Sequence, residues 1–270
     1  MTKQRADRPN GLPARFCAPI LLPDSLARFS QEGTHTMSKR LFTKLGQGRQ
    51  VSETFRLGLL LALSGGLMDA YSYLFRGEVF ANAQTGNILL FSVNLSQGNW
   101  GMVKEYGCPV LAFGAGITIA FLIRQHFQRR LTRLHWRQLG VLMEIAILTF
   151  VAFQPQTRNL LANSLTSLAC GFQVEAFRKI HGNSIATTMC IGNFRAGLHA
   201  LGEYWFSRKR SDRNKALTYF IVIAFFAIGA VLGSRLIAQV GQWAILCSSG
   251  LLAVCFLLMF IQTEEEKYQH

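Results

Sequence analysis

The chain has 270 residues, of which 50% are hydrophobic and only 16% are charged. Soluble domains usually carry about a quarter charged residues, so this composition excludes a disordered protein, a disulfide scaffold and most cytosolic enzymes. Lys and Arg number 28 against 14 acidic residues, a net charge of +14, but no nucleic-acid-binding motif accompanies the charge. We therefore expect membrane lipids among the partners, and no nucleic acid.

Residues 1–50 are predicted to be a basic, largely disordered N-terminal extension, because they show no periodic apolar pattern. Met37 opens a basic stretch, MSKRLFTK, that resembles a natural N-terminus. Met37 is therefore an alternative start of translation. Residues 51–262 are predicted to form a polytopic membrane domain, and residues 263–270 a short polar tail.

A membrane span needs about 20 mostly apolar residues. Six blocks meet this description and predict an all-α integral membrane protein. They are Leu57–Phe75, Gly107–Ile123, Leu139–Phe153, Leu160–Phe177, Ala216–Ile237 and Trp243–Ile261. The third block is short and carries Glu144, which we expect near the membrane interface.

Two further stretches, Val79–Leu95 and Ser184–Leu201, have the length of a helix but polar first halves. Each holds a Gly-Asn pair, which weakens a helix and leaves amide groups that need partners. Such backbone exists at membrane depth only when it packs within protein or lines a wet cavity. We interpret both stretches as broken or re-entrant helices.

The basic residues favour six full spans with two re-entrant pieces. With a cytoplasmic N-terminus, this topology places Arg124–Arg137, Arg178–Lys179 and Arg208–Lys215 on the cytoplasmic side, where membrane proteins collect Lys and Arg. Eight full spans remain the alternative.

Similar spacings of small and polar residues suggest two related halves, about 56–137 and 158–240. An inverted repeat of this kind, with interrupted helices meeting near the midplane, is a recurring transporter design. The matching elements are Gly66, Asp69-Ala70 and Gly86-Asn87 in the first half, and Gly171, Glu175-Ala176 and Gly192-Asn193 in the second.

The segments GGLMDAYSYL at Gly65–Leu74 and VFANAQTGN at Val79–Asn87 resemble the signature of the YoaK-like family, domain of unknown function 1275. The resemblance covers roughly Arg56 to Ile261 and excludes the N-terminal extension. It implies a multi-span bacterial inner-membrane protein without an assigned activity. The matching positions are Gly66, Asp69, Ala70, Ser72, Tyr73, Thr85, Gly86 and Asn87.

Asp69 is the strongest candidate for a functional residue, because an ionised carboxylate inside a span costs about 2.5–3.5 kcal/mol on insertion scales. Asp69 is expected either to bind a proton or cation, or to be a buried hydrogen-bond anchor. The amides and carbonyls of the two broken stretches offer groups that replace a solute's hydration shell. The candidate substrate- or ion-binding residues are Asp69, Ser72, Tyr73, Thr85, Gly86, Asn87, Glu175, Gly192 and Asn193.

Two candidate assignments have structural alternatives. Glu175 is explained almost as well by a surface ion pair with the basic residues that follow it. Arg195, His199 and Glu203 follow one another at four-residue spacing on one helix face. They are candidates for a proton relay, or for a salt-bridged stripe in the protein interior.

The motifs of common enzyme and metal sites are missing from the sequence: it contains no GxSxG, HExxH or Walker loop. We therefore expect no catalytic residues, no metal and no cofactor. The predicted function is gradient-driven or passive transport of an unknown small solute or ion. The alternative is a membrane-embedded binding or scaffold protein, and an oligomer is compatible with either.

Overall fold

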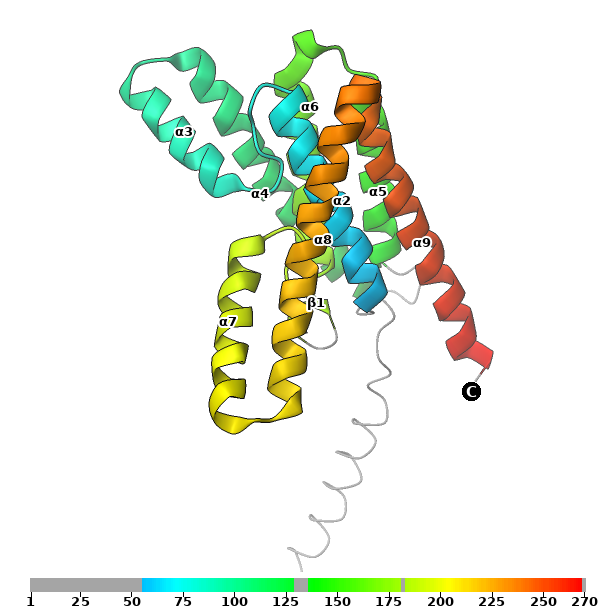
Figure 1. Cartoon of the computed structure of the whole chain (residues 1–270). Helices are drawn as coiled ribbons and strands as arrows, with labels where there is room; N and C mark the ends of the chain where they lie inside the picture. The colour runs from blue at the N-terminus through cyan, green and yellow to red at the C-terminus, as the bar shows by residue number, and fades with distance from the viewer. Residues whose placement is uncertain (1–54, 129–135, 181–182, 269–270) are drawn as a thin grey trace, which may run out of the picture. The chain divides into compact units, whose positions relative to one another are not determined.

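The structure is a computed structural model that describes residues 55–128, 136–180 and 183–268. The predictions made for residues 1–50, including the alternative start at Met37, lie outside the described residues. Helices dominate the described part of the chain (Figure 1). Its elements are α2 (Phe55–Phe75), α3 (Gln84–Ser96), α4 (Trp100–Gln128), α5 (Trp136–Ala152), η2 (Gln156–Arg158), α6 (Asn159–Ala176), β1 (Lys179–Ile180), β2 (Asn183–Ser184), α7 (Cys190–Ser207), α8 (Arg210–Val240), η3 (Gly241–Ala244) and α9 (Ile245–Tyr268).

The six apolar blocks correspond to six separate helices, namely α2, α4, α5, α6, α8 and α9. By length and composition, three stretches of the described chain can cross a membrane: Phe55–Phe75, Trp100–His126 and Arg210–Met259. The last of these contains α8, η3 and most of α9. The 17 residues of α5 fall short of a usual span, and α6 buries polar side chains such as Thr166, Ser167 and Gln173.

Two helical hairpins extend from a central bundle. Helix α3 packs along the first part of α4, and α7 packs along the first part of α8. The two hairpins extend toward opposite ends of the bundle, with α3 at the top and α7 at the bottom of the view in Figure 1. Helix α3 therefore runs back toward the end of the bundle at which α2 ends, and α7 runs back toward the end at which α6 ends.

Glycines allow two helix pairs of the bundle to make backbone contact. A Cβ atom on Gly66 of α2 would lie 1.9 Å from the carbonyl oxygen of Phe226 in α8, and one on Gly229 would lie 2.0 Å from that of Leu63. Helices α6 and α4 meet in the same way. There, a Cβ atom on Gly171 would lie 2.3 Å from the carbonyl oxygen of Phe113, and one on Gly116 would lie 2.2 Å from that of Leu168. Small residues let helices approach this closely in lipid.

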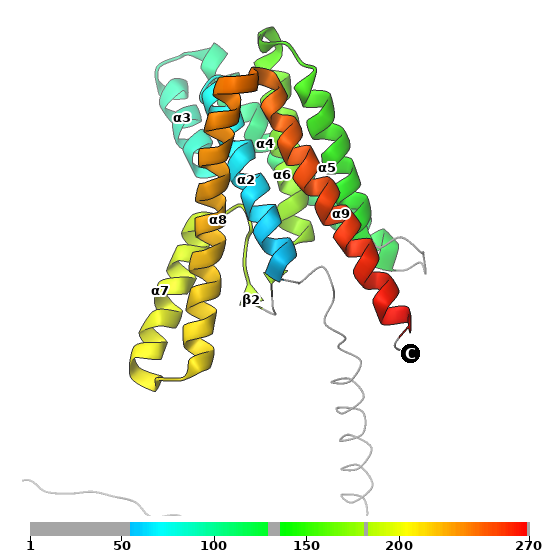
Figure 2. The same ribbon diagram turned by 45° about the vertical axis from the view of Figure 1, so that its right-hand side comes forward.

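The main apolar core lies between α2, α5, α6 and α9, which Figure 2 shows side by side. Leu61, Met68, Leu148 and Leu252 are among its fully buried members. Apolar side chains of α2, α5, α6 and α9 thus hold the four helices together around this core.

Glu144, which the sequence analysis expects near the membrane interface, also lies in this region. Its exposed fraction is 0%, and neither carboxylate oxygen has a hydrogen-bond partner. Helix α5 packs against both α6 and α9, so the face that carries Glu144 is enclosed by protein.

Candidate functional site

The chain between α2 and α3 is held in place by Asn87, in the first turn of α3. The Asn87 Oδ1 accepts a hydrogen bond from the Phe80 amide at 3.0 Å, and its Nδ2 donates to the Phe80 carbonyl oxygen at 2.7 Å. Gly86 faces the Phe80 ring, where a Cβ atom would lie 2.8 Å from the ring carbon Cε2. The segment before α3 is thus folded back onto the start of that helix.

Asn193 makes the same pair of contacts at the start of α7. Its Oδ1 accepts from the Ala186 amide at 3.3 Å, and its Nδ2 donates to the Ala186 carbonyl oxygen at 2.6 Å. In both cases the partner residue lies seven positions before the asparagine.

This arrangement corrects the expected position of the two interruptions. The Gly-Asn pairs were expected to sit at the breaks, but Gly86-Asn87 and Gly192-Asn193 lie in the first turns of α3 and α7. The non-helical segments come just before these helices. The asparagine side chains satisfy backbone groups of those segments, and this removes much of the cost of irregular backbone inside the protein.

Asp69 joins α2 to the segment before α3. Its Oδ1 accepts a hydrogen bond from the Asn82 amide at 2.7 Å, and the amides of Ala81 and Ala83 also stabilise the carboxylate. The Asn82 side chain in turn donates to the carbonyl oxygen of Gly65 in α2 at 3.2 Å. The carboxylate therefore lies at the N-terminal end of α3, where the helix dipole favours negative charge.

A cavity of about 390 Å³ lies where the two interrupted stretches meet. Helix α2 contributes Asp69 and α8 contributes Phe226, while the remaining lining comes from the starts of α3 and α7. Those residues are Asn82, Ala83, Gln84, Thr85, Thr188, Met189, Cys190 and Ile191. One carboxylate, two amide side chains and two threonines thus face or border an otherwise apolar space, the mixed lining that small-solute sites have.

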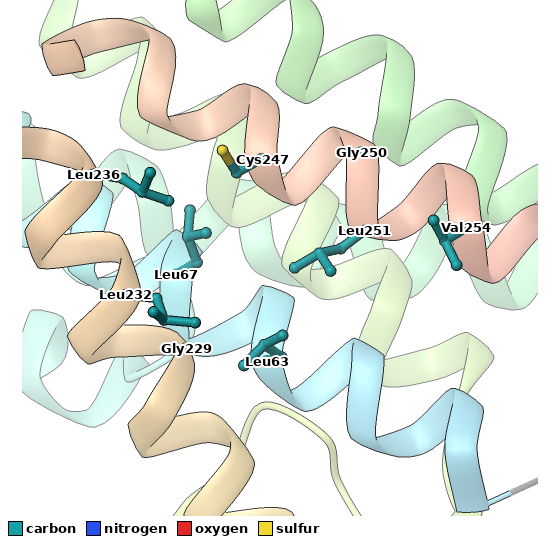
Figure 3. A pocket seen from close by; sticks show the side chains of 9 residues that line it. All are labelled: Leu63, Leu67, Gly229, Leu232, Leu236, Cys247, Gly250, Leu251 and Val254. Atoms are coloured by element: carbon teal, nitrogen blue, oxygen red, sulfur yellow. The ribbon is translucent and has the colours of Figure 1, made fainter. Parts of the chain in front are cut away.

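A second cavity of about 380 Å³ lies between α2, α8 and α9, and Figure 3 shows its lining. Leucine, glycine and valine residues form its walls, together with Cys247. This lining offers few polar groups to orient a solute, so the cavity beside Asp69 is the better candidate site.

The predicted site residues are only partly brought together. Asp69 and Thr85 line the cavity, while Asn87 and Asn193 shape its walls through the segments they hold. Ser72 is buried and donates to the carbonyl oxygen of Asp69 within α2. Tyr73 is 38% exposed and stacks on Phe80 with ring centroids 4.8 Å apart. Gly192 is exposed, and no heavy atom lies within 4 Å of a Cβ placed on it.

Glu175 lies in surroundings different from those of Asp69. It pairs with Arg124 of α4 at 3.1 Å and with Arg178 at 3.5 Å, which agrees with the ion-pair alternative. Asp69 is the third residue after Gly66, whereas Glu175 is the fourth after Gly171. Because each residue turns a helix by about 100°, the one-residue difference directs Glu175 away from the cavity.

The three residues considered as a proton relay lie outside the site. Arg195, His199 and Glu203 are all exposed on α7, and no hydrogen bond or ion pair joins them within the described residues. The alternative of a buried, salt-bridged stripe does not fit this exposure either.

Sequence reasoning missed Arg76, which follows α2 and is 1% exposed. Its guanidinium donates to the Tyr71 hydroxyl at 2.7 and 3.0 Å, and to the carbonyl oxygens of Val151 and Gln154 at 3.2 and 2.8 Å. It also donates to the Pro155 oxygen at 3.2 Å and to Asn159 Oδ1 at 3.3 Å. A lone arginine after an apolar block gave no sign of these partners.

Gln173 was also missed. From α6, its Nε2 donates to the Leu61 carbonyl oxygen in α2 at 3.1 Å and to the Thr187 hydroxyl at 3.0 Å. This buried side chain therefore ties α2 and α6 to the segment before α7, one residue from the cavity wall at Thr188. It positions the site without lining it.

No group of three or more His, Cys, Asp or Glu side chains that could hold a metal occurs among the described residues.

A family model described as a protein of unknown function, DUF1275, matches residues 57–258. The chain belongs to this family. It is similar to the UPF0700 transmembrane protein YoaK of Bacillus subtilis, with 25% identity over 181 residues, which are 64% of this chain and 79% of the relative. No solved structure matches the chain. The transmembrane relative and the apolar helices together support an integral membrane protein of the DUF1275 family, as the sequence resemblance predicted.

Proposed function

We propose that this protein is a gradient-driven or passive transporter of a small solute or ion, and not an enzyme. One observation carries the proposal. The two interrupted stretches, far apart in the sequence, border one cavity that also contains the carboxylate of Asp69. Interrupted helices that meet inside the protein beside a charged side chain are a recurring design of transport sites.

The arrangement of helices supports a topology of six full spans with α3 and α7 as re-entrant pieces. Helices α2 and α6 run in opposite directions, and each is followed by an interrupted stretch and a short helix (Figure 1, Figure 2). The matching contacts of Asn87 and Asn193, and of Gly66 and Gly171, support an inverted repeat. In such a repeat, either half can open the shared site to one side of the membrane.

The distribution of basic residues supports an inner-membrane protein with a cytoplasmic N-terminus. The turn between α7 and α8 and the first residues of α8 together hold Arg208–Lys215, and they lie at the end of the bundle where α2 begins (Figure 1). Arg124 and Arg178 meet around Glu175 at the end of α6. Positive charge collected at one end marks the cytoplasmic side.

Asp69→Asn is expected to fold and insert normally but to transport poorly. Asparagine keeps an oxygen that can accept the hydrogen bond from the Asn82 amide, and it removes the negative charge of the carboxylate. The measurement is solute-dependent proton flux into proteoliposomes that enclose a pH-sensitive dye, with a mixture of organic acids, amino acids, sugars and amines as solutes. We expect this flux to fall at least about tenfold, which corresponds to about 1.4 kcal/mol. Glu105→Gln, the same change on α4 outside the cavity, should leave the flux unchanged.

Equal flux for Asp69→Asn and the wild-type protein would remove Asp69 from the transport site. Failure of Asp69→Asn to accumulate in the membrane would identify the acid as a structural anchor. That result would favour the alternative, a membrane-embedded binding or scaffold protein.

Single cysteines placed at Gln97 and Thr132, in a variant without native cysteines, test the topology. Gln97 follows α3, and in the sequence Thr132 comes between the residues of α4 and those of α5. With six spans, a membrane-impermeant maleimide added from the periplasmic side should label Gln97→Cys and leave Thr132→Cys unlabelled. Eight full spans predict the reverse pattern at both positions.

A further inference from the structure

The start of α7 presents unpaired backbone amides to the cavity. Thr188, Met189, Cys190 and Ile191 all line it, and the side chain of the N-cap residue Met189 makes no capping hydrogen bond. In the described part of the chain, the amides of Thr188 and Cys190 have no hydrogen-bond acceptor, and Met189 follows a turn at residues 187–188. The first amides of a helix lack partners within the helix, and together with the helix dipole they favour an anion.

The corresponding position at α3 already holds an anion, the carboxylate of Asp69. Asn82, whose amide donates to Asp69, lies five residues before Asn87, and Thr188 lies five residues before Asn193. The start of α7 has no equivalent acid, because Glu175 pairs with Arg124 and Arg178 instead. At the cavity, the N-terminus of α3 thus has a carboxylate of the protein beside it, whereas the N-terminus of α7 has none.

Two buried side chains in the cavity wall point independently to a missing ligand. Thr188 is 4% exposed and Asn82 is 3% exposed, and both line the cavity. The Thr188 hydroxyl and the Asn82 Oδ1 have no hydrogen-bond partner. Buried polar groups are nearly always paired, and leaving one unpaired costs about 1–3 kcal/mol. A ligand that donates to Asn82 and accepts from Thr188 removes this cost.

We propose that the cavity binds a small solute that carries a carboxylate. The solute's carboxylate accepts hydrogen bonds from the amides at the start of α7 and from the Thr188 hydroxyl, as Asp69 does from the amides before α3. This inference rests on the proposed transport function, because it names the class of solute for the same cavity. The negative charge of Asp69 in that cavity is balanced either by an ammonium group of the solute or by a proton on Asp69.

Calorimetric titration of the purified full-length protein in detergent tests this assignment without requiring transport. The probes are acetate, which has a carboxylate only; L-alanine, which adds an ammonium group; and acetamide, a neutral molecule of the same shape as acetate. Acetate or L-alanine is expected to bind, with acetamide at least about tenfold weaker. Equal affinity for acetamide, or binding of neither carboxylate, would overturn the assignment.

The variant Met189→Asp gives a sharper test, because it supplies the missing carboxylate at the N-cap of α7. Asp is a preferred N-cap residue, and Met189 is 38% exposed, so the fold should be kept, with a melting temperature no lower than that of the wild-type protein. Binding of the carboxylate probe should be lost, since its place is occupied. Met189→Leu is the matched control and should bind normally. Wild-type affinity in Met189→Asp would contradict the proposal.

Asp69→Asn then identifies the source of charge balance. Weaker binding of L-alanine in this variant indicates that the solute's ammonium pairs with Asp69. Tighter binding of acetate in this variant indicates that Asp69 of the wild-type protein must take up a proton when acetate binds, because the neutral asparagine makes that proton unnecessary. Carboxylate binding without flux in proteoliposomes would reject transport alone, and flux of a solute without a carboxylate would reject this inference alone.

Discussion

Gly66→Ala is expected to prevent α2 and α8 from packing and to reduce the amount of folded protein in the membrane sharply. The new Cβ would lie 1.9 Å from the Phe226 carbonyl oxygen and 2.9 Å from the Ala230 amide nitrogen. Both are backbone atoms, so no side chain can rotate away, and the two helices must separate. Overpacking usually costs about 1–3 kcal/mol, and here the whole helix pair is displaced, so we expect the upper end of that range or more.

Expression level and melting temperature in detergent measure this effect. Gly171→Ala, which meets the Phe113 carbonyl oxygen at 2.3 Å, should be comparably damaging to the α4–α6 pair. The control is Gly114→Ala in α4, where no heavy atom lies within 4 Å of the added Cβ. Wild-type stability in Gly66→Ala would mean that the helices do not meet as closely as described.

Arg76→Met is expected to destabilise the protein by at least about 3 kcal/mol, because it leaves several buried acceptors without a donor and each such group costs about 1–3 kcal/mol. The substitution leaves the Tyr71 hydroxyl and the carbonyl oxygens of Val151 and Gln154 without their donor. Those carbonyls lie at the end of α5, where a positive charge is also favoured by the helix dipole. Arg76→Lys should recover only part of the loss, because one ammonium group cannot reach all these acceptors.

Thermal melting of the detergent-solubilised protein measures the loss. Arg158→Met is the matched control, since Arg158 lies in the α5–α6 connection that Arg76 contacts but is itself exposed. A similar small effect for both variants would show that the buried network contributes little to stability.

The sequence predicted the helices well because their signal is local. Each of the six apolar blocks became a helix, and the polar residues before Gln84 and Cys190 correctly indicated interruptions. The exact place of the interruptions was missed, since a Gly-Asn pair is equally suited to a break and to the first turn of a helix. Only the contact between each asparagine and the residue seven positions earlier distinguishes the two.

The sequence could predict a site residue where that residue type is costly in lipid. It could not do so where the role of a residue depends on which way its side chain faces. Asp69 could be singled out because a carboxylate inside an apolar block needs a partner. Arg195, His199 and Glu203 have the right spacing for a row, but spacing does not tell which way the row faces, and it is exposed.

The sequence by itself determined the membrane class, the helical segments and the family, and it singled out Asp69 as an acid that needs a polar partner. The tertiary structure decided which faces are buried, and so placed Glu144 in the core, paired Glu175 with Arg124 and enclosed Arg76. The physical reason is that lipid is as apolar as a protein core. A spanning helix is therefore apolar on every side, and its sequence carries little record of which side meets the protein.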